Sequence, residues 1–488
     1  MIGWGAKAEM SVQTDSRLVK PGDTFVAVRG AASDGARFVP QALAAGAVRI
    51  VSEGEPPPDL PAGVEWERVP DSRAATAWLS CEAAGHPSRR LSVVGVTGTN
   101  GKTTVANLVR RALEGCGVPC GLVSTIVDDA HPLASSAPVA AHNTTPGPVE
   151  LQGILRDALA NGCRAVAMEV SSHGLEQRRA DGTRFACAVF TNLTQDHLDY
   201  HGTMDAYFAA KRRLFFDLAP RAAVVNADDE AGARLLEELR GAVGDAAPRV
   251  LWSYGFTAGC DLRIRGLSLG PRGSAFDLSL PGGRGEVPIR TALLGRHNAL
   301  NLAAAFGAAL SLGLDPAAVA TSLGAAPPVR GRLEPVRVPG SPASFFVDYA
   351  HTPDALRNVL RTLRELTSAR LFAVFGAGGD RDRGKRPLMG EACAELADEL
   401  VVTSDNPRSE DPAAIIRDIL AGIPDAVRAR TAVEPDRRAA IRRAVAMANR
   451  EGDVVLVAGK GHEDYQVFAD RTVRFDDREE LLAAGRAR

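Results

Sequence analysis

The sequence predicts an α/β fold with three domains: a small N-terminal α/β domain, a central P-loop-type domain built on a parallel sheet, and a C-terminal Rossmann-like domain. Short apolar runs recur at the spacing of βαβ units, and most of them end in a polar or glycine-rich segment. A length of 488 residues is enough for about three domains that each bury a core. The pair Pro327-Pro328 is typical of a linker, and we place the domains at residues 1–89, 90–329 and 330–488.

The first block contains two strand-like runs and one helix. Residues 23–28 and 48–51 are rich in Val and Ile, and an Ala-rich helix is expected to begin at Val39. The proline-rich stretch 53–61 is expected to be a surface loop.

A glycine-rich turn at residues 95–104, with the sequence GVTGTNGKTT, opens the second block. An apolar run at 91–96 predicts a strand before the turn, and apolar residues at helical spacing predict a helix over 103–113. The backbone N–H groups of such a helix N-terminus bind phosphate, Lys102 would reach the β/γ-phosphates, and the Thr103 hydroxyl would ligate magnesium. Val96 stands where the general pattern has glycine, so a purely structural turn is the alternative.

Further runs at 165–168, 188–191 and 223–225 predict parallel strands, and each is followed by a polar residue, namely Glu169, Asn192 and Asn226. From Leu251 to Leu294 the pattern alternates, which predicts a small antiparallel addition.

The third block repeats this arrangement with runs at 345–347, 371–375, 400–402 and 454–457. Because each run continues into a polar, glycine-rich segment, we expect four strand ends to form one rim that holds a second ligand site.

Composition excludes several classes of protein. A net charge of −2 gives no field that would attract nucleic acid or an anionic membrane. We find no 18-residue apolar run, and the first seven residues lack the features of a signal peptide, so we expect a cytoplasmic protein without a membrane span. Seven scattered cysteines indicate reduced thiols, and the Cys116/Cys120 pair lacks the partners of a zinc site.

Several polar residues are candidates for chemistry, each with a plainer alternative. Glu169 is a potential magnesium ligand or an acid at a helix N-terminus. His197, between Asp196 and Asp199, is either functional or a hydrogen-bonded structural histidine. Lys211, on a helix expected over 204–216, would ordinarily be a solvated cation.

Arg408 follows Asn406 and Pro407, and its planar guanidinium matches a carboxylate bidentately. With Arg386 and Glu463 it would form a pocket of both charge signs, as a zwitterionic amino acid requires. Surface ion pairing is the competing interpretation.

Taken together, these segments resemble the Mur ligases of peptidoglycan synthesis over nearly the whole chain. The motifs are GTNGKT, NTT at 143–145, EVSSHGL, TNLxxDHLDYHG, NADD at 226–229, GxxNxxN at 295–301, DYAHTP and GKGHE. The chain is similar to the MurE-type members that add diaminopimelate, because Asp405-Asn-Pro-Arg408 resembles their version of this tetrapeptide.

The resemblance implies four groups of site residues. The ATP site would comprise Gly98, Thr99, Asn100, Gly101, Lys102, Thr103, Thr104, Asn298, Arg332, Asp348 and His351. Magnesium would be held by Thr103, Glu169, His197 and a carbamylated Lys211 (N6-carboxylysine), and the catalytic residues would be Lys102, Glu169, His197 and Lys211. The UDP-muramoyl dipeptide would contact Ser16, Asn143, Thr144, Thr145, Ser171, Gln177 and Arg179. The diaminopimelate pocket would comprise Arg386, Asp405, Asn406, Pro407, Arg408, Gly459 and Glu463.

The implied activity is ATP- and Mg²⁺-dependent amide synthesis by a monomer, joining meso-diaminopimelate to the D-Glu of UDP-N-acetylmuramoyl-L-Ala-D-Glu through an acyl phosphate. The resemblance assigns UDP-sugar binding to the first domain, ATP binding to the second and amino-acid binding to the third. The alternatives are a ligase like folylpolyglutamate synthase and a non-catalytic, nucleotide-gated binding protein.

Overall fold

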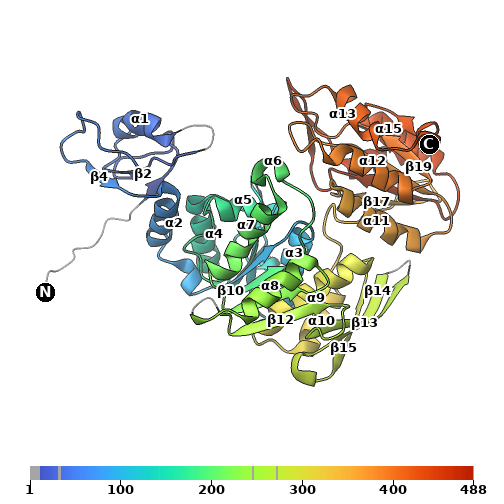
Figure 1. Ribbon diagram of the computed structural model, residues 1–488, viewed down its shortest axis with the longest axis horizontal. Helices are drawn as coiled ribbons and strands as arrows, with labels where there is room; N and C mark the ends of the chain where they lie inside the picture. The colour runs from blue at the N-terminus through green and yellow to red at the C-terminus, as the bar shows by residue number, and fades with distance from the viewer. Residues whose placement is uncertain (1–10, 31–33, 142, 245–246, 271–272, 487–488) are drawn as a thin grey trace.

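The computed structural model describes residues 11–30, 34–141, 143–244, 247–270 and 273–486. Three sheet-bearing domains follow one another along the chain, with the blue N-terminal and the orange-to-red C-terminal domain on opposite sides of the central one (Figure 1). The α/β fold class is therefore confirmed, whereas the residue boundaries of the domains stay a prediction. The segment 1–7, which was considered for a signal peptide, lies outside the described residues.

The N-terminal domain is a four-stranded parallel sheet in the order β1-β2-β3-β4. Its elements are β1 (Val12–Gln13), β2 (Thr24–Val26), β3 (Arg49–Ser52), β4 (Glu65–Arg68), α1 (Val39–Ala44) and α2 (Ser72–Ala83). Asp71 caps α2 by accepting hydrogen bonds from the backbone of Arg73 and Ala74. Helix α2 packs against α4 (Pro148–Ala160) and so joins this domain to the central one.

An eleven-stranded mixed sheet forms the centre of the molecule, in the order β15-β14-β13-β12-β11-β10-β5-β9-β6-β7-β8. Its parallel strands are β5 (Ser92–Thr97), β6 (Cys120–Val123), β9 (Ala165–Glu169), β10 (Phe185–Phe190), β11 (Ala222–Asn226) and β12 (Val250–Gly255). The antiparallel edges are β7 (Val127–Asp129) and β8 (Val139–Ala140) on one side, and β13 (Leu262–Gly270), β14 (Gly273–Ser279) and β15 (Glu286–Thr291) on the other.

The prediction of an antiparallel addition over 251–294 is therefore wrong for its first strand. β12 pairs in parallel with β11, and only the strands that follow form the antiparallel hairpins. The apolar and aromatic residues of β12 belong to a partly buried parallel strand, whereas the alternation that suggested an antiparallel strand begins at β13.

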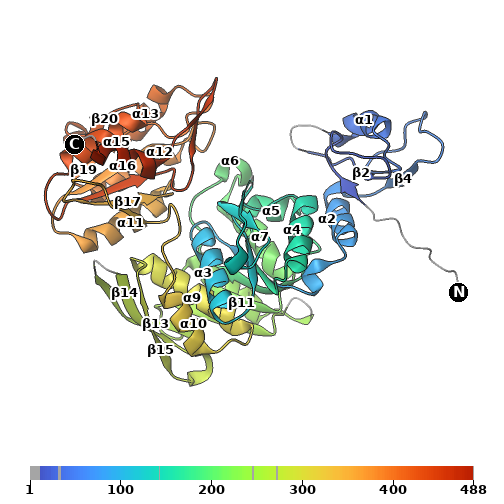
Figure 2. The same ribbon diagram turned by 180° about the vertical axis from the view of Figure 1, so that it is seen from behind.

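Helices cover both faces of the central sheet. One layer consists of α3 (Lys102–Gly115), α9 (Arg296–Ser311) and α10 (Pro316–Gly324), which lie side by side in the view from behind (Figure 2). The other consists of α4, α5 (Ser172–Glu176), α7 (Met204–Phe216) and α8 (Glu230–Arg240), and the short α6 (Leu198–His201) precedes α7. Continuous apolar cores between sheet and helices hold the carboxyl ends of β5, β9, β10 and β11 in one row.

The C-terminal domain has a six-stranded sheet in the order β16-β17-β21-β18-β19-β20, with β16 as its antiparallel edge. The strands are β16 (Glu334–Val336), β17 (Ser344–Asp348), β18 (Leu371–Phe375), β19 (Glu399–Val402), β20 (Ala432–Val433) and β21 (Val454–Ala458), with a hairpin of β22 (Tyr465–Val467) and β23 (Thr472–Arg474). One face carries α11 (Pro353–Leu366), α12 (Lys385–Leu396), α13 (Pro412–Ala421) and α14 (Asp425–Arg428); the other carries α15 (Arg437–Met447) and α16 (Asp477–Arg486). The four strands predicted to form one rim are neighbours and parallel, as expected.

In the described part of the chain, none of the helices combines the length and the apolar character that crossing a bilayer requires.

Candidate active site

Two glycines shape the turn between β5 and α3. Gly98 has a φ of +149° and Gly101 a φ of +87°. A Cβ atom on Gly98 would lie 1.8 Å from Oγ1 of Thr191, and one on Gly101 would lie 2.6 Å from Oδ1 of Asn301. The turn passes so close to the loop after β10 and to α9 that neither position accepts a larger residue. The N-terminus of α3 borders the cavity described below.

The two lysines expected to be catalytic lie at this turn. Nζ of Lys102 donates to the carbonyl oxygens of Gly98 (2.9 Å) and Thr99 (2.8 Å). Nζ of Lys211, which projects from α7, donates to the same Gly98 oxygen at 2.7 Å and is buried. The expectation that Lys211 is a solvated cation is therefore wrong: helix position alone does not reveal that α7 packs its lysine under the turn.

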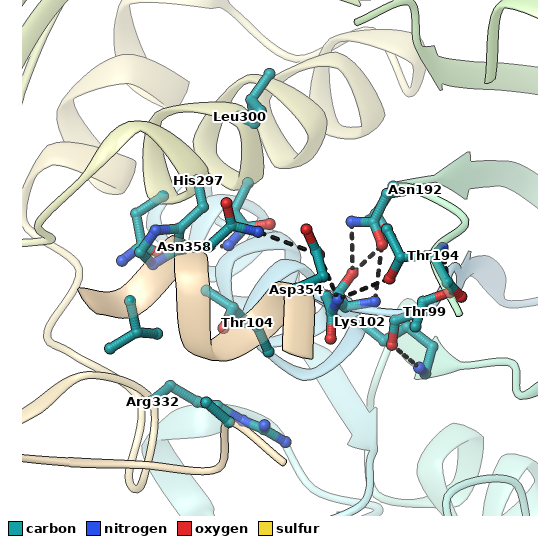
Figure 3. Close-up of a pocket in the computed structure, with 18 of the residues that line it drawn as sticks. Thr99, Lys102, Thr104, Asn192, Thr194, His297, Leu300, Arg332, Asp354 and Asn358 are labelled. Atoms are coloured by element: carbon teal, nitrogen blue, oxygen red, sulfur yellow. Dashed lines mark hydrogen bonds between the residues drawn. The ribbon is translucent and has the colours of Figure 1, made fainter. Parts of the chain in front are cut away.

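A cavity of about 620 Å³ lies between the turn and the C-terminal domain, large enough for a nucleotide (Figure 3). All of the residues expected to bind ATP except Gly98 line it. Asp354 of α11 points at the turn and accepts a hydrogen bond from Nδ2 of Asn100 at 3.2 Å. Both domains therefore form its walls.

The linker after Pro327-Pro328 also reaches this cavity. Nη2 of Arg332 donates to Oγ1 of Thr103 at 2.9 Å, and its guanidinium lies over the ring of Tyr349. Asp348, whose pKa is raised by burial, accepts from the backbone of Leu333 (2.5 Å) and Ala350 (2.7 Å). Asp348 thus fixes the loop that carries Arg332 instead of facing solvent.

Asn298 and His351 take positions at the cavity wall. Nδ2 of Asn298 donates to the carbonyl oxygen of Leu294 at 2.8 Å, and its Oδ1 accepts from Asn301. Nδ1 of His351 lies 2.8 Å from the carbonyl oxygen of Tyr349. Burial lowers the pKa of His351 to about 4, so this imidazole is neutral at pH 7.

Glu169 ends β9 and is buried at the edge of the cavity. Oε1 accepts a hydrogen bond from the backbone N–H of Thr125 at 2.7 Å, and Oε2 accepts from the Thr125 hydroxyl at 3.1 Å. It does not lie within a helix N-terminus, which removes the plainer interpretation. Thr125 therefore orients this carboxylate, a role that no sequence motif indicated.

Asp196 joins the two domains through charge. Its carboxylate lies 3.5 Å from Nε2 of His197, and, across the domain boundary, 4.0 Å from Nε2 of His351 and 3.6 Å from Nζ of Lys385. Burial alone would raise the pKa of Asp196, but Lys385 and the two histidines hold it below its usual range. Burial lowers the pKa of His197 to about 3, which leaves its imidazole neutral and able to ligate a metal.

Two of the four donors expected for magnesium suit that ion chemically. Thr103 and Glu169 supply hard oxygen atoms that line the cavity, and His197 lines it as well. Within the described ranges, no group of three or more His, Cys, Asp or Glu side chains is arranged to hold a metal alone. Mg²⁺ usually takes one or two protein carboxylates and completes its shell with phosphate oxygens and water.

The residues expected to contact the UDP-muramoyl dipeptide fall into two places. Around the start of α5, Oγ1 of Thr145 accepts from the backbone of Ser171 at 2.9 Å, and Nη1 of Arg179 donates to the Thr145 carbonyl at 2.8 Å. Gln177 accepts from Arg179, and Thr144 accepts from Thr125. Asn143 is next to this cluster in sequence, whereas Ser16 lies in the N-terminal domain, where it donates to Gln41.

The second ligand site lies at the carboxyl ends of β19 and β21. Nδ2 of Asn406 donates to Oε2 of Glu463 at 2.8 Å. Arg408 has a φ of +53°, and its Nη1 donates to the carbonyl oxygen of Gly379 at 2.6 Å. No carboxylate among the described residues forms an ion pair with Arg408, whose guanidinium is therefore open to an external acid group. Pro407 stands between Asn406 and Arg408.

Arg386 differs from the expectation. Its side chain is buried, and its guanidinium is bound by Glu410 at 2.8 Å and Asp418 at 2.9 Å. The chain itself thus supplies the carboxylates that Arg386 was expected to take from a ligand. Arg381, on the loop that precedes α12, is exposed and, like Arg408, flanks Gly378; it makes no ion pair with any described residue.

A contact path connects the two sites. The ring of His462, next to Glu463, packs against Tyr349 at 5.1 Å, and the backbone of Thr125 approaches His462 from the central domain. The loop that orients Glu169 therefore also borders the second ligand site.

Known domain families match three parts of the chain. Residues 10–82, 96–309 and 331–461 match three domains described respectively as the Mur ligase family catalytic domain, the Mur ligase middle domain and the Mur ligase glutamate ligase domain.

The chain belongs to the Mur ligase family. This Mur ligase is 45% identical to the UDP-N-acetylmuramoyl-L-alanyl-D-glutamate–2,6-diaminopimelate ligase of Geobacter sulfurreducens, over 97% of the chain and 94% of the relative. The same enzyme of Solibacter usitatus is 47% identical over 95% and 91% of the two chains. A solved structure of such a ligase matches with a TM-score of 0.68 at 35% identity, covering 98% of this chain and 94% of that one. A folylpolyglutamate synthase of Mycobacterium tuberculosis shares the fold at 19% identity and a TM-score of 0.62.

Proposed function

We propose that this Mur ligase joins meso-diaminopimelate to the D-glutamate of UDP-N-acetylmuramoyl-L-Ala-D-Glu and hydrolyses ATP to ADP and phosphate in doing so. The observation that carries the proposal is the pairing of two unlike sites on facing domains. One is a phosphate-binding turn in a nucleotide-sized cavity. The other is a strand-end cluster of the C-terminal domain, with two carboxylates and a guanidinium that has no ion pair among the described residues. The relatives at 45–47% identity support diaminopimelate as the amino acid.

ATP makes the reaction possible because a carboxylate offers an amine no adequate leaving group. The γ-carboxylate of D-glutamate attacks the γ-phosphorus, ADP departs, and an acyl phosphate forms. The amine then attacks the acyl carbon, and phosphate leaves from the tetrahedral intermediate as the amide forms. Two anions must approach in the first step, so the positive charge of Lys102 and the N–H groups at the start of α3 are needed there.

Mg²⁺, held by Thr103, Glu169, His197 and a carbamylated Lys211, would supply further charge neutralisation at the phosphates. Arg332 holds the Thr103 hydroxyl in this structure and would move to the nucleotide when the ion binds. Positioning contributes the rest: Asn100 to Asp354 and Asp196 to Lys385 hold the domains together around the cavity, which keeps water from the acyl phosphate.

Diaminopimelate would be held at the end remote from its reacting amine. Arg408 would bind one carboxylate bidentately, with Asn406 beside it, while Asp405 and Glu463 would face an ammonium group. Gly459 leaves room for Asp405, because a Cβ there would lie 2.7 Å from its Oδ2. We place Arg381 in this pocket and assign Arg386 to holding the loop through Glu410 and Asp418.

A ligase like folylpolyglutamate synthase, the rival interpretation, would differ in the substrate to which it adds the amino acid. Phosphate release from ATP should require UDP-N-acetylmuramoyl-L-Ala-D-Glu together with diaminopimelate. A folate with L-glutamate should give no release above the ATP-only background, and stimulation by folate instead would overturn the proposal. A cytoplasmic, monomeric state stays a prediction.

A further inference from the structure

Lys460 is a buried cation in the second ligand site, and it is not among the residues expected to bind a ligand. It follows β21, and Gly459 (φ +115°) and Gly461 (φ +54°) on either side of it adopt left-handed backbone conformations. Its Nζ donates to Oδ1 of Asn406 at 3.1 Å and to Oε2 of Glu463 at 3.0 Å. It also lies 3.7 Å from Oδ1 of Asp405.

The charges of this group do not balance. One ammonium faces two carboxylates, so the group of Asp405, Lys460 and Glu463 carries one net negative charge. Oε2 of Glu463 is engaged by both Lys460 and Asn406, whereas Oε1 accepts no hydrogen bond from any described residue. The side chain of Asp405 likewise accepts none there. Buried charges are ordinarily paired, so an excess carboxylate at these strand ends indicates that a cation arrives from outside.

Neighbouring groups do not cancel the excess. Arg437, the nearest further cation on α15, is fully buried in a bidentate pair with Asp477 and is therefore neutralised. The other titratable groups that interact with the two carboxylates are Tyr349, Tyr465 and His351, and His462 interacts with Lys460; Arg408 and Asp464 lie beside Tyr465. The guanidinium of Arg408 points to Gly379 instead.

We propose that Lys460 is a positioning residue for the amino-acid substrate. It neutralises one of two carboxylates and fixes Oε2 of Glu463 and Oδ1 of Asn406, so that a single net negative charge faces the substrate ammonium. The inference rests on the proposed function and deepens it. Without Lys460 two buried carboxylates remain with no cation between them, so the pair holds one shared proton more readily, and the incoming ammonium must displace it.

A charge-restoring double variant tests this assignment. Lys460→Gln keeps an amide that can donate hydrogen bonds but removes the charge, and Asp405→Asn removes one carboxylate. At pH 6.5 we expect each single variant to raise KM for diaminopimelate by about tenfold. The double variant again carries one net negative charge, so its KM for diaminopimelate should be at least about fivefold lower than that of either single variant. KM for ATP should stay unchanged in all three.

The pH profile separates charge from mere structure. In Lys460→Gln, KM for diaminopimelate should fall between pH 6.5 and 8.5 as the shared proton is lost. In Asp405→Asn, where Lys460 and Glu463 cancel, KM should be raised equally at both pH values. Purely additive effects in the double variant, or a KM unchanged in Asp405→Asn, would overturn the inference. Because Asp405→Asn keeps the buried cation paired, it serves as the test even where Lys460→Gln does not fold. A wild type without diaminopimelate-dependent phosphate release would instead refute the proposed function.

Discussion

Lys102 and Lys211 donate to the same acceptor, the carbonyl oxygen of Gly98, at 2.9 and 2.7 Å. Two ammonium groups on one oxygen, that of Lys211 buried and that of Lys102 half-buried, repel each other. Burial first, and then the charge of Lys102, lower the pKa of Lys211 well below the usual lysine value. A lysine in this position exists readily as the neutral amine, which is the form that adds to CO₂.

The first prediction follows from that neutral amine. Protein equilibrated with ¹³C-bicarbonate should show a carbamate ¹³C resonance, which Lys211→Met abolishes and Lys20→Met, at an exposed lysine, retains. Lys211→Met should lower kcat by about 10²-fold or more, because it removes the carbamate oxygens that would help to hold Mg²⁺ at the phosphates. A carbamate signal of equal size in Lys211→Met would contradict the assignment.

A second prediction concerns amino-acid selection by Arg408. Arg408→Ala should reduce kcat/KM for diaminopimelate by about 10³-fold or more, because the substrate carboxylate would then enter the site without a cation to pair with. ADP binding, measured by calorimetry, should be unchanged. Arg383→Ala is the matched control, since this arginine is exposed on a nearby loop and pairs with Glu410. Normal use of diaminopimelate by Arg408→Ala would show that the pocket is assigned wrongly.

The third prediction separates Arg386 from Arg381. Arg386→Met removes the buried cation that Glu410 and Asp418 share and leaves Glu410 only the exposed Arg383, and we expect it to destabilise the protein by about 3 kcal/mol. The pKa of Glu410, which the hydrogen bond from Arg386 lowers to about 2, should rise in that variant. Arg381→Ala should leave the thermal unfolding midpoint within about 1 °C and raise KM for diaminopimelate. The reverse pattern of effects would return Arg386 to the ligand pocket.

Acid should destabilise the fold through its buried histidines, which is the fourth prediction. Burial lowers the pKa of His297 and His351 to about 4 and that of His462 to about 3, from the ordinary value of 6.5. Between these values the unfolded chain binds more protons than the folded one, so stability falls as the pH drops from about 6.5 to 4. The unfolding midpoint temperature should decrease over this window, and less steeply in His297→Gln. A midpoint independent of pH there would contradict these pKa shifts.

Much of the fold could be predicted because its local signals agree. The parallel strands are continuous apolar runs, and the polar residues after them, such as Glu169 and Asn192, lie at strand ends on either side of β5 and line one cavity, as expected. β12 was assigned wrongly because periodicity over a short run does not reveal whether its neighbour is parallel.

The site was harder to predict where it depends on packing across distant segments. The burial of Lys211 and the pairing of Arg386 with Asp418 arise from tertiary contacts that helical spacing cannot show. Lys385 reaches Asp196 only because the C-terminal domain docks on the central one. Lys460 stood inside a motif already noted, and its role became visible only with its two carboxylate neighbours.

Substrate choice tests the central claim most directly. Phosphate release should be measured with ATP, Mg²⁺ and UDP-N-acetylmuramoyl-L-Ala-D-Glu, comparing meso-diaminopimelate with L-lysine, which lacks the second carboxylate. We predict release with diaminopimelate and, with L-lysine, a kcat/KM at least about 10³-fold lower, together with a UDP-muramoyl tripeptide detected by mass spectrometry. Equal use of the two amino acids, or release without tripeptide, would contradict the account.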